Sequence, residues 1–249
     1  MVYLIFVIFI SLIHPESAFY CSKGIFISDI GNFGINDGKI WLKKGNKTSV
    51  FINGLKDPKG IFLHKGKIYV TDVVKIWEID IKTKKKKELI KPSDFQTPPQ
   101  FLNDIFVSEN GKVYFSDTFK DAVFVFDLKT KKLKMLFKID KPNGIWVKDG
   151  VVYVVTFTRP GKLYKFKNGK LTLIYKSKDI NGGDGLCIRG KFAYISGYYS
   201  GKIVRYNLIN GKVKVIKSGL KTPADIFVKG NKMGIPLLEA GKFIEIEIK

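Results

Sequence analysis

Apolar residues along this chain occur in short runs separated by polar turns, and the arrangement repeats. Five segments share one pattern, an apolar run, a glycine-containing turn and a second run; they are residues 57–72, 101–117, 141–156, 182–197 and 222–237. Residues 14–29 align with residues 57–72 without a gap, so the pattern occurs six times, at intervals of about 40 to 44 residues. A fixed interval of this length is typical of repeat proteins and propellers.

Each repeat predicts four short strands. The runs are rich in β-branched and aromatic residues, and Asn-Gly, Asp-Gly or Lys-Gly steps mark the turns between them. No long helical periodicity follows residue 13. Six units of four antiparallel strands predict an all-β chain that forms a six-bladed β-propeller over residues 14–249. The last unit ends after its third strand, so this blade is incomplete unless another segment supplies a strand.

The first thirteen residues allow two interpretations. Residues 3–13 form an unbroken apolar run of the length of a signal-peptide core, too short for a membrane span. We favour a signal peptide and therefore a periplasmic or secreted protein, although the run lacks a basic start and a clear cleavage site. Alternatively, residues 1–13 supply the outer strand that the last blade lacks, and the protein is then cytoplasmic.

Two apolar columns define the register of the repeat. The first column is Ala18, Ile61, Ile105, Ile145, Leu186 and Ile226, and the next is Phe19, Phe62, Phe106, Trp146, Cys187 and Phe227. An inner strand packed between neighbouring blades requires apolar side chains, so we expect both columns in the core between blades. Cys187 is then a small buried side chain, and Cys21, on a different blade, is not its disulfide partner.

The charge of the chain is strongly positive. Lys and Arg number 44 against 22 Asp and Glu, which gives a formal net charge of +22, but only three of the basic residues are arginine. Because base and phosphate recognition favours bidentate arginine, this composition argues against a nucleic-acid reader. The lysine runs at 82–87 and 129–132 fall in turns between third and fourth strands, which predicts a solvated surface.

A third column is polar and precedes the first apolar column by two positions. Its members are Glu16, Lys59, Asn103, Asn143, Asp184 and Ala224. Since inner strands surround the channel of a propeller, we expect these residues to form a ring at one mouth. Carboxylate and amide oxygens suit one hard divalent cation, Ca²⁺ in the first place, with Mg²⁺, Mn²⁺ or Zn²⁺ as alternatives. The competing interpretation is that Asn143 and Asp184, each followed by glycine, are ordinary turn residues.

The histidines and cysteines exclude other chemistries. The chain contains only His14 and His64, and only two cysteines. A multi-histidine metal site and a zinc ribbon are therefore ruled out. Neither histidine lies near a recognisable nucleophile elbow, so a Ser-His-Asp triad is not expected.

Four short motifs carry a family resemblance. PES at 15–17, LND at 102–104, PNG at 142–144 and GDG at 183–185 resemble, in order, the channel motifs of the gluconolactonase, regucalcin and luciferin-regenerating-enzyme superfamily of six-bladed propellers. Paraoxonases are more distant members. The resemblance covers residues 14–249 and is closest to an exported, uncharacterised branch. It implies Glu16, Asn143 and Asp184 as ligands of one divalent cation, and Asn103 as a fourth ligand or a substrate contact.

The resemblance further implies a divalent-metal-dependent hydrolase of lactones or related esters, in which Asp184 activates water or attacks directly. Phe101 stands where sugar-lactone-hydrolysing relatives carry an arginine, which puts sugar-acid specificity in doubt. Lys59 could turn inward and contact an anionic substrate or Glu16, but we favour a side chain that extends outward to solvent. Cleavage of a signal peptide would have to precede Glu16.

The turns between second and third strands lie on the same face as the ring. They predict a rim formed by Phe33, Phe119, Arg159, Tyr198 and Tyr199. We expect a monomer that binds a small molecule there. The second hypothesis is a non-catalytic exported propeller that binds a ligand or a protein partner around a structural ion. An open coordination site beneath a pocket favours the hydrolase, whereas a closed ion in a narrow channel favours the binding protein.

Overall fold

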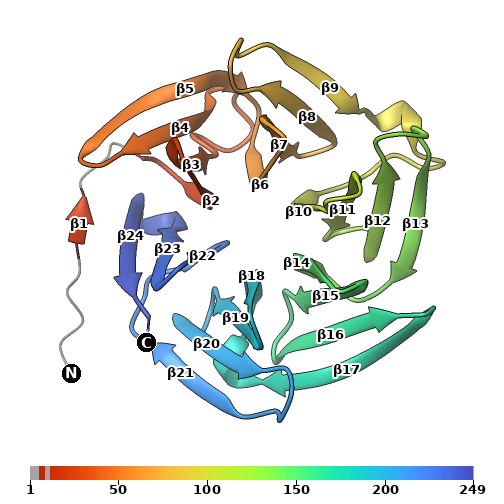
Figure 1. Cartoon of the computed structure of the whole chain (residues 1–249), viewed down its shortest axis with the longest axis vertical. Coiled ribbons are helices and arrows are strands. Elements are labelled where there is room, and N and C mark those ends of the chain that lie inside the picture. Colours follow the sequence, from red (N-terminus) through yellow and green to blue (C-terminus); the bar gives the residue numbers. More distant parts are fainter. Residues whose placement is uncertain (1–5, 9–11, 249) are drawn as a thin grey trace.

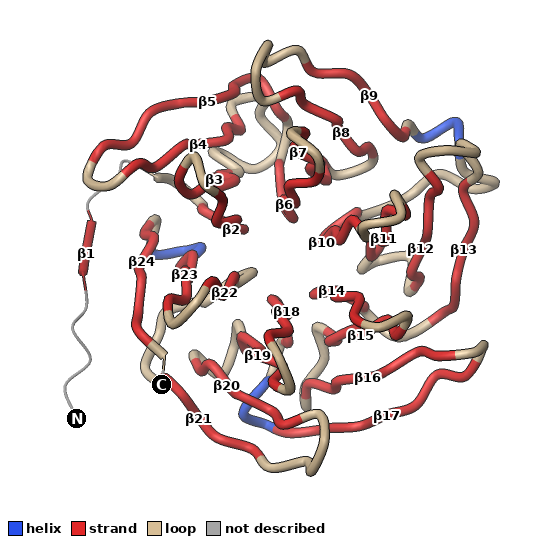
Figure 2. Tube along the Cα trace, viewed as in Figure 1, coloured by secondary structure: helices blue, strands red, loops and turns tan. Residues whose placement is uncertain are grey.

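The computed structural model describes residues 6–8 and 12–248, which form six sheets arranged around a central axis (Figure 1). Each sheet has four antiparallel strands. We number the sheets as blades one to six in chain order. The prediction of a six-bladed, all-β propeller is therefore confirmed. The helical content of the described residues is limited to three short 3-10 turns (Figure 2).

The elements have the following bounds. Blade one contains β2 (Pro15–Cys21), β3 (Gly24–Asp29), β4 (Gly38–Lys44) and β5 (Lys47–Leu55). Blade two contains β6 (Pro58–His64), β7 (Lys67–Asp72), β8 (Lys75–Asp80) and β9 (Lys86–Ile90), followed by η1 (Pro92–Asp94). Blade three contains β10 (Leu102–Val107), β11 (Lys112–Asp117), β12 (Ala122–Asp127) and β13 (Leu133–Lys138).

In the second half, blade four contains β14 (Pro142–Lys148), β15 (Val151–Thr156), β16 (Gly161–Lys167) and β17 (Lys170–Ser177), followed by η2 (Lys178–Ile180). Blade five contains β18 (Gly183–Arg189), β19 (Phe192–Gly197), β20 (Lys202–Asn207) and β21 (Val213–Lys217). Blade six contains β22 (Phe227–Lys229), β23 (Lys232–Leu237), η3 (Leu238–Ala240), β24 (Lys242–Glu247) and, from the other end of the chain, β1 (Phe6–Ile8).

Both ends of the chain contribute to blade six. β1 pairs antiparallel with β24, with Phe6 opposite Glu245 and Ile8 opposite Phe243 (Figure 1). The sheet order β1-β24-β23-β22 places β1 at the outer edge, where the C-terminal unit is one strand short. This pairing is the one that the outer-strand alternative predicts for the first thirteen residues. Residues 1–5 and 9–11, which the signal-peptide prediction also includes, lie outside the described residues.

The first apolar column lies in the core between blades, as predicted. Its six residues are all buried, with at most 3% of each exposed. The hydrophobic clusters around them combine two adjacent blades; in one of these clusters Phe26 and Ile40 of blade one pack with Ile61 and Ile68 of blade two. Burial of these apolar faces between sheets is the main contribution to the stability of the ring of blades.

The second apolar column differs from the prediction, because its side chains meet on the axis instead of between blades. Phe19 contacts both Phe62 and Phe227, with ring centroids 4.8 and 4.3 Å apart. Trp146 lies 6.2 Å from Phe62 and 5.9 Å from Phe227, although these residues belong to blades that are not neighbours. Successive residues of a strand point to opposite sides, so the two columns enter different environments. The aromatic column fills the channel below the polar column.

The remaining position of that column is occupied by Cys187. Its side chain is 1% exposed, and its Sγ accepts a hydrogen bond from Val228 N at 3.3 Å. Burial raises the pKa of its thiol far above the usual range. Cys21 and Cys187 are both free, so the prediction of a buried, unpaired Cys187 is confirmed.

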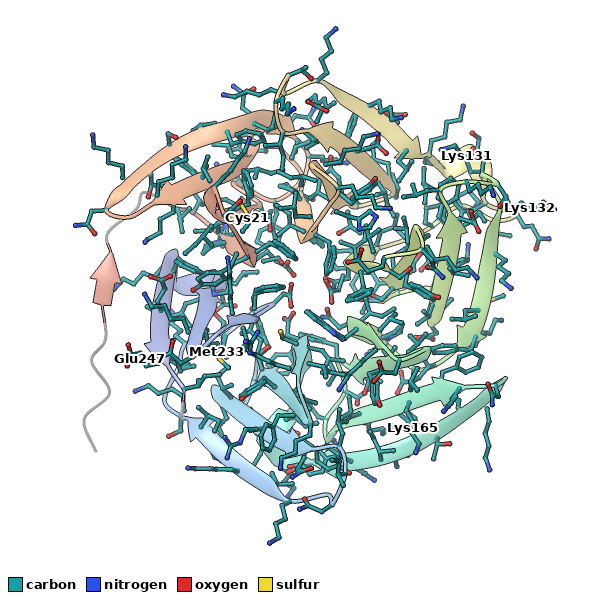
Figure 3. All side chains as sticks on the ribbon, in the orientation of Figure 1. Cys21, Lys131, Lys132, Lys165, Met233 and Glu247 are labelled. Carbon is teal, nitrogen blue, oxygen red and sulfur yellow. The ribbon has the colours of Figure 1, made fainter. Side chains whose placement is uncertain are left out.

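The lysine-rich turns lie on the face opposite the polar column. Ile81 N donates to Gly66 O and Leu128 N donates to Gly111 O, so these turns pack beside the turns that follow the inner strands. Residues 82–87 and 129–132 are exposed, and Lys131 and Lys132 project from the periphery (Figure 3). No helix in the described part of the chain is long and apolar enough to cross a membrane.

Candidate metal and ligand site at the channel mouth

The structure brings five of the six polar-column residues into one cavity. Glu16, Lys59, Asn103, Asn143 and Asp184 line a space of about 180 Å³ at the mouth of the channel. All five are buried, with 2 to 5% exposed. Oxygen-tipped side chains surround the axis in the view down the propeller (Figure 3). We call these five residues the ring. Ala224, the sixth member of the column, is buried but does not line the cavity.

The glycines that follow Asn143 and Asp184 do not make turns. Both motifs lie inside inner strands, β14 and β18, and neither Gly144 nor Gly185 has a positive φ. A Cβ at Gly144 would lie 2.3 Å from the backbone oxygen of Asp184, and one at Gly185 would lie 2.5 Å from Ile226 N. The glycines are required because neighbouring inner strands approach closely here. The turn interpretation of Asn143 and Asp184 is therefore wrong.

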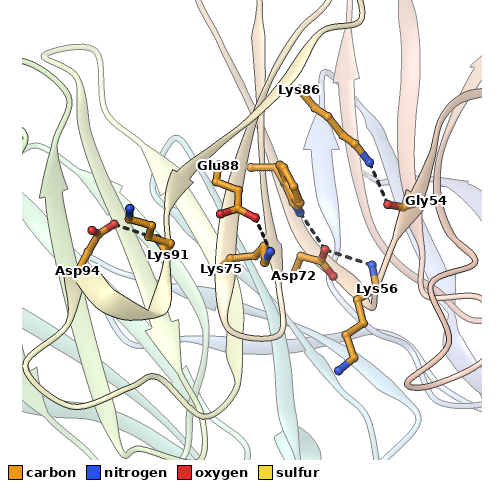
Figure 4. Close-up of polar contacts among 9 residues, drawn as sticks. Gly54, Lys56, Asp72, Lys75, Lys86, Glu88, Lys91 and Asp94 are labelled. Atoms are coloured by element: carbon orange, nitrogen blue, oxygen red, sulfur yellow. Dashed lines mark hydrogen bonds and ion pairs between the residues drawn. The ribbon is translucent and has the colours of Figure 1, made fainter.

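Three aspartates hold the segments that lead into the ring. Asp29, Asp72 and Asp117 each end the second strand of their blade. Their carboxylates accept backbone hydrogen bonds from the residue two positions before a ring residue: His14 N at 2.8 Å, Asp57 N at 2.7 Å and Phe101 N at 2.9 Å. Figure 4 shows Asp72, which also accepts hydrogen bonds from Lys56 N and from the indole of Trp77. These contacts fix the backbone segments that lead into Glu16, Lys59 and Asn103.

Two further contacts join strands at the outer edge of the propeller. Lys86 Nζ, on β9, donates to the backbone oxygen of Gly54 in blade one at 2.9 Å (Figure 4). Within blade two, Lys75 forms an ion pair with Glu88 across β8 and β9 (Figure 4). Both pairs are solvent-exposed or nearly so, and they are expected to contribute little to stability on their own. They join strands at the periphery of the propeller and do not reach the mouth.

Four ring oxygens lack any hydrogen-bond partner although they are buried. They are Glu16 Oε2, Asn103 Oδ1, Asn143 Oδ1 and Asp184 Oδ1. Among the described residues only Thr48 Oγ1 and Asn181 Oδ1, which do not line the cavity, share this property. A buried oxygen without a partner costs roughly 1–3 kcal/mol, so four around one cavity require an explanation. A cation bound among these four oxygens would satisfy all of them.

The orientation of the Asn103 amide follows from its neighbour. Thr118 Oγ1 donates its only proton to Pro142 O at 2.7 Å. It can therefore only accept from Asn103, and the 3.2 Å contact identifies the Asn103 atom as the amide nitrogen Nδ2. The amide oxygen of Asn103 is consequently the atom that faces the cavity.

Two buried carboxylates beneath the ring were missed by the sequence analysis. Asp104 accepts hydrogen bonds from Ile105 N and Ile145 N, both at 2.7 Å, and so ties blade three to blade four. Asp225 accepts a hydrogen bond from Ser17 Oγ and ties blade six to blade one. The available signal was their shared column, which directly follows the polar column. They bind the blades together through these hydrogen bonds.

The ring is electrostatically poised for a cation. Burial, and secondarily the charge of Asp184, raise the pKa of Glu16 well above its usual range. Burial and the charge of Asp225 do the same for the pKa of Asp184. Burial also raises the pKa of Asp225 to about 7. Burial and neighbouring negative charge thus disfavour the ionised forms of these carboxyl groups in the metal-free protein.

The donor set determines which cation fits. Only oxygen ligands face the cavity, and zinc prefers nitrogen and sulfur, so the residues fit Ca²⁺, Mg²⁺ or Mn²⁺ better than Zn²⁺. The described residues contain no cluster of three or more His, Cys, Asp or Glu side chains arranged for a metal. A cation at the ring would therefore need the two amide oxygens in addition to the two carboxylates.

Lys59 differs from the expectation that it extends to solvent. Its side chain is 2% exposed, and Nζ lies 4.5 Å from the ring centroid of Phe101 and 6.0 Å from that of Phe33. Burial lowers the pKa of Lys59, and the charges of Glu16, Asp57, Asp72 and Asp184 oppose this shift. The side chain turns inward toward these charges and the aromatic faces.

Three of the five predicted rim residues line the cavity. Phe33, Phe119 and Tyr198 do, whereas Arg159 and Tyr199 do not. The guanidinium of Arg159 instead stacks on the ring of Tyr199, 3.4 Å from its centroid. Four further apolar residues, which the sequence did not predict for the rim, line the cavity: Ile30, Phe101, Phe157 and Leu238. The cavity therefore has a polar floor and a mostly apolar wall.

The raised carboxyl pKa values predict an unusual pH dependence for the metal-free protein. The folded state holds protons on groups such as Asp225 up to about pH 7, where the unfolded chain has already lost them. The stabilisation that results is complete below the pKa of these groups in the unfolded chain, and it is lost as the pH rises through their pKa in the folded protein. We expect the urea midpoint in chelator to be higher at pH 5 than at pH 8.

Two controls accompany this measurement. Ca²⁺ should reduce the difference, because a bound cation favours the carboxylate form. Asp225→Asn should also reduce it, since it removes one of the titrating groups. A metal-free midpoint that falls steadily from pH 8 to pH 5 would contradict the electrostatic description of the ring.

Comparison with known proteins agrees with the fold. No family model and no curated protein matches the sequence significantly. Among solved structures, a gluconolactonase from Xanthomonas campestris superimposes with a TM-score of 0.80 at 12% identity, covering 99% of this chain and 90% of that one. A chain of a nidogen/laminin complex gives 0.75 at 15% identity, covering 94% and 89%.

A third structure is the virginiamycin B lyase from Staphylococcus aureus, crystallised with quinupristin. It gives a TM-score of 0.71 at 16% identity and covers 99% of each chain. At these identities the likeness concerns the fold. The class defined by fold and site is thus a six-bladed propeller with a buried polar ring at one channel mouth, and its structural neighbours include a gluconolactonase and a lyase.

Proposed function

We propose that the ring binds one divalent cation, Ca²⁺ in the first place, and that the protein hydrolyses lactones or related esters. The observation that carries the proposal is the set of four buried, unpartnered oxygens on Glu16, Asn103, Asn143 and Asp184. The motif resemblance and the gluconolactonase among the structural neighbours support the same chemistry. A divalent cation supplies Lewis-acid polarisation of an ester carbonyl and stabilisation of the oxyanion.

The residues of the chain have distinct tasks in this proposal. Glu16, Asn143 and Asp184 hold the cation, and Asn103 presents its oxygen as a fourth ligand or a substrate contact. Asp184 holds or moves the proton of the attacking water, a task that its position as a buried carboxylate lining the cavity allows. The apolar wall excludes bulk water and holds the uncharged part of the substrate. The cavity of about 180 Å³ limits the substrate to a small molecule.

The second candidate is a non-catalytic propeller that binds a small ligand or a protein partner around a structural ion. The aromatic side chains that contact one another across the axis beneath the ring favour it, since they narrow the channel there. The neighbour in the nidogen/laminin complex shows that the fold also occurs in protein complexes. Under both candidates we propose a monomeric, exported protein in which residues 1–13 are a signal peptide. The alternative is a cytoplasmic protein in which residues 1–13 supply the outer strand.

A hydrolysis screen tests the proposal. Purified protein is assayed on a panel of γ- and δ-lactones and aryl esters, with Ca²⁺ and with excess chelator. We expect hydrolysis of at least one lactone that chelator abolishes and Ca²⁺ restores. If no ester is hydrolysed in a chelator-sensitive way while Ca²⁺ binds normally, the hydrolase proposal fails and the binding protein stands.

A further inference from the structure

Lys59 gives the cavity a feature that a cation site alone does not need. It is a ring residue on β6, and its side chain is buried among the walls of the cavity. The face of Phe101 lies 4.5 Å from its ammonium, and the stacked ring of Phe119 lies 4.5 Å beyond that of Phe101. The ammonium of Lys59 thus lies against aromatic rings and lines the same cavity as the proposed cation ligands.

The hydrogen bonds of Lys59 are incomplete. Its ammonium has three donor protons, and the structure gives it a single long hydrogen bond, 3.5 Å to Asp57 O. Among the described residues no carboxylate lies within ion-pair distance of Lys59. A buried ammonium is costly unless it is paired, and a cation–π contact offsets part of that cost. Donors therefore remain available to an acceptor inside the cavity.

The charges of the ring determine the sign of that acceptor. Glu16, Asp184 and Lys59 are the charged residues that line the cavity. A divalent cation would neutralise the two carboxylates, so the ammonium of Lys59 would remain as the charged group in contact with a ligand, and a ligand with one negative charge would match it. A phosphate dianion is disfavoured, because its second negative charge would have no cationic side chain to match it among the residues that line the cavity.

We propose that Lys59 selects a monoanionic ligand, so that the site takes small lactones or esters bearing a carboxylate. This inference deepens the proposed function and rests on it for the reacting group, while the carboxylate contact itself depends only on Lys59. The ammonium binds the substrate carboxylate, and Phe101 and Phe33 hold the ammonium in place. In the protein without substrate, the same ammonium is retained by the aromatic faces and by the distant charges of Glu16 and Asp184.

The test uses ligands that cannot be hydrolysed. Tetrahydrofuran-2-carboxylate and its uncharged isostere tetrahydrofuran-2-carboxamide are titrated calorimetrically into the protein, with Ca²⁺ present and with chelator. We expect wild type with Ca²⁺ to bind the carboxylate about tenfold or more tightly than the carboxamide, the effect of one charge-assisted hydrogen bond in a buried site. Lys59→Met, which keeps the length of the stem, should reduce this preference to within about twofold.

A matched control is available in a second buried lysine. Lys43, on β4, is 5% exposed and pairs with Gly45 O and Glu245 away from the cavity, so Lys43→Met should keep the full carboxylate preference. Wild type that binds both probes equally, or binds neither, would overturn the inference. So would a Lys59→Met variant that keeps the preference. Should Lys59→Met fail to fold, Lys59→Gln, which also removes the positive charge, takes its place in the comparison.

The result of this binding test can be distinguished from the result of the lactone screen. A carboxylate preference that disappears in Lys59→Met, together with no hydrolysis in the lactone screen, supports the anionic site and contradicts the hydrolase. Chelator-sensitive hydrolysis of neutral lactones without any carboxylate preference contradicts the role of Lys59 alone.

Discussion

Asp184→Asn is expected to lower the affinity for Ca²⁺ by on the order of a hundredfold or more and to abolish chelator-sensitive ester hydrolysis. Substitutions that merely support a metal ligand already cost about 10–100-fold, and Asp184 is proposed as a ligand itself. The asparagine keeps the shape of the side chain but removes a negative charge from a buried ring that holds only two carboxylates facing the cavity. Affinity is measured by calorimetric titration and activity by the lactone assay.

The control for this substitution is Asp149→Asn. Asp149 is 85% exposed and lies far from the ring, in the turn between β14 and β15. The same chemical change there should leave both Ca²⁺ affinity and hydrolysis within about twofold of wild type. If Asp184→Asn behaves like Asp149→Asn, the carboxylate does not contribute to a cation site.

Gly144→Ala is expected to lower the free energy of unfolding by about 3 kcal/mol or more and to weaken Ca²⁺ binding at the same time. A Cβ at this position would lie 2.3 Å from the backbone oxygen of Asp184 and 2.7 Å from Leu186 N. Neither atom belongs to a flexible side chain, so blades four and five must separate. Because Asn143 and Asp184 flank this contact, the ring opens with it. Urea unfolding and calorimetry measure the two effects.

Gly169→Ala separates steric overlap from backbone strain. Gly169 has φ +76°, and no atom lies within 4 Å of the position that an alanine methyl group would take, so alanine there meets open space. It should cost about 1–2 kcal/mol through the left-handed backbone conformation and leave Ca²⁺ affinity unchanged. A Gly144→Ala variant no less stable than Gly169→Ala would contradict the close approach of the inner strands.

The fold and the arrangement of the ring were predictable because both depend on periodicity. A side-chain column in a repeat lies at one level of the propeller, so Glu16, Asn103, Asn143 and Asp184 could be grouped across 168 residues of sequence without knowing any distance. The same logic correctly placed the Ile61 column between blades. Periodicity predicts the height of a residue along the propeller axis, because equivalent residues of the six repeats lie at the same height.

The direction of individual side chains was not predictable in the same way. Lys59 has a flexible stem, and its inward orientation depends on the faces of Phe101 and Phe33, which reach it from other segments. Phe62 and Trp146 fill the axis because of the closure of all six blades, a property that no single repeat contains. Arg159 left the rim because Tyr199, a neighbour only in the folded chain, stacks on it.

Asp104 and Asp225 illustrate a further limit. Their column also contains Ser17 and three glycines, so it has no uniform chemistry that would mark it. The residues of this column share a position at the close contact between adjacent inner strands. Glycine occupies it where the neighbouring backbone comes too near for a side chain, and at Asp104 and Asp225 a carboxylate forms a hydrogen bond across the contact. Such a role becomes visible only when the blades are placed side by side.

The central claim is that the four unpartnered oxygens of the ring bind one divalent cation. The most direct measurement is the Ca²⁺ stoichiometry of chelator-treated, re-titrated protein, compared between wild type, Glu16→Ala and Asn143→Ala. The account predicts one saturable Ca²⁺ per chain in wild type and strongly reduced binding in both variants, each of which should remain folded by circular dichroism. Undiminished binding in both variants, or no saturable binding in wild type, would contradict it.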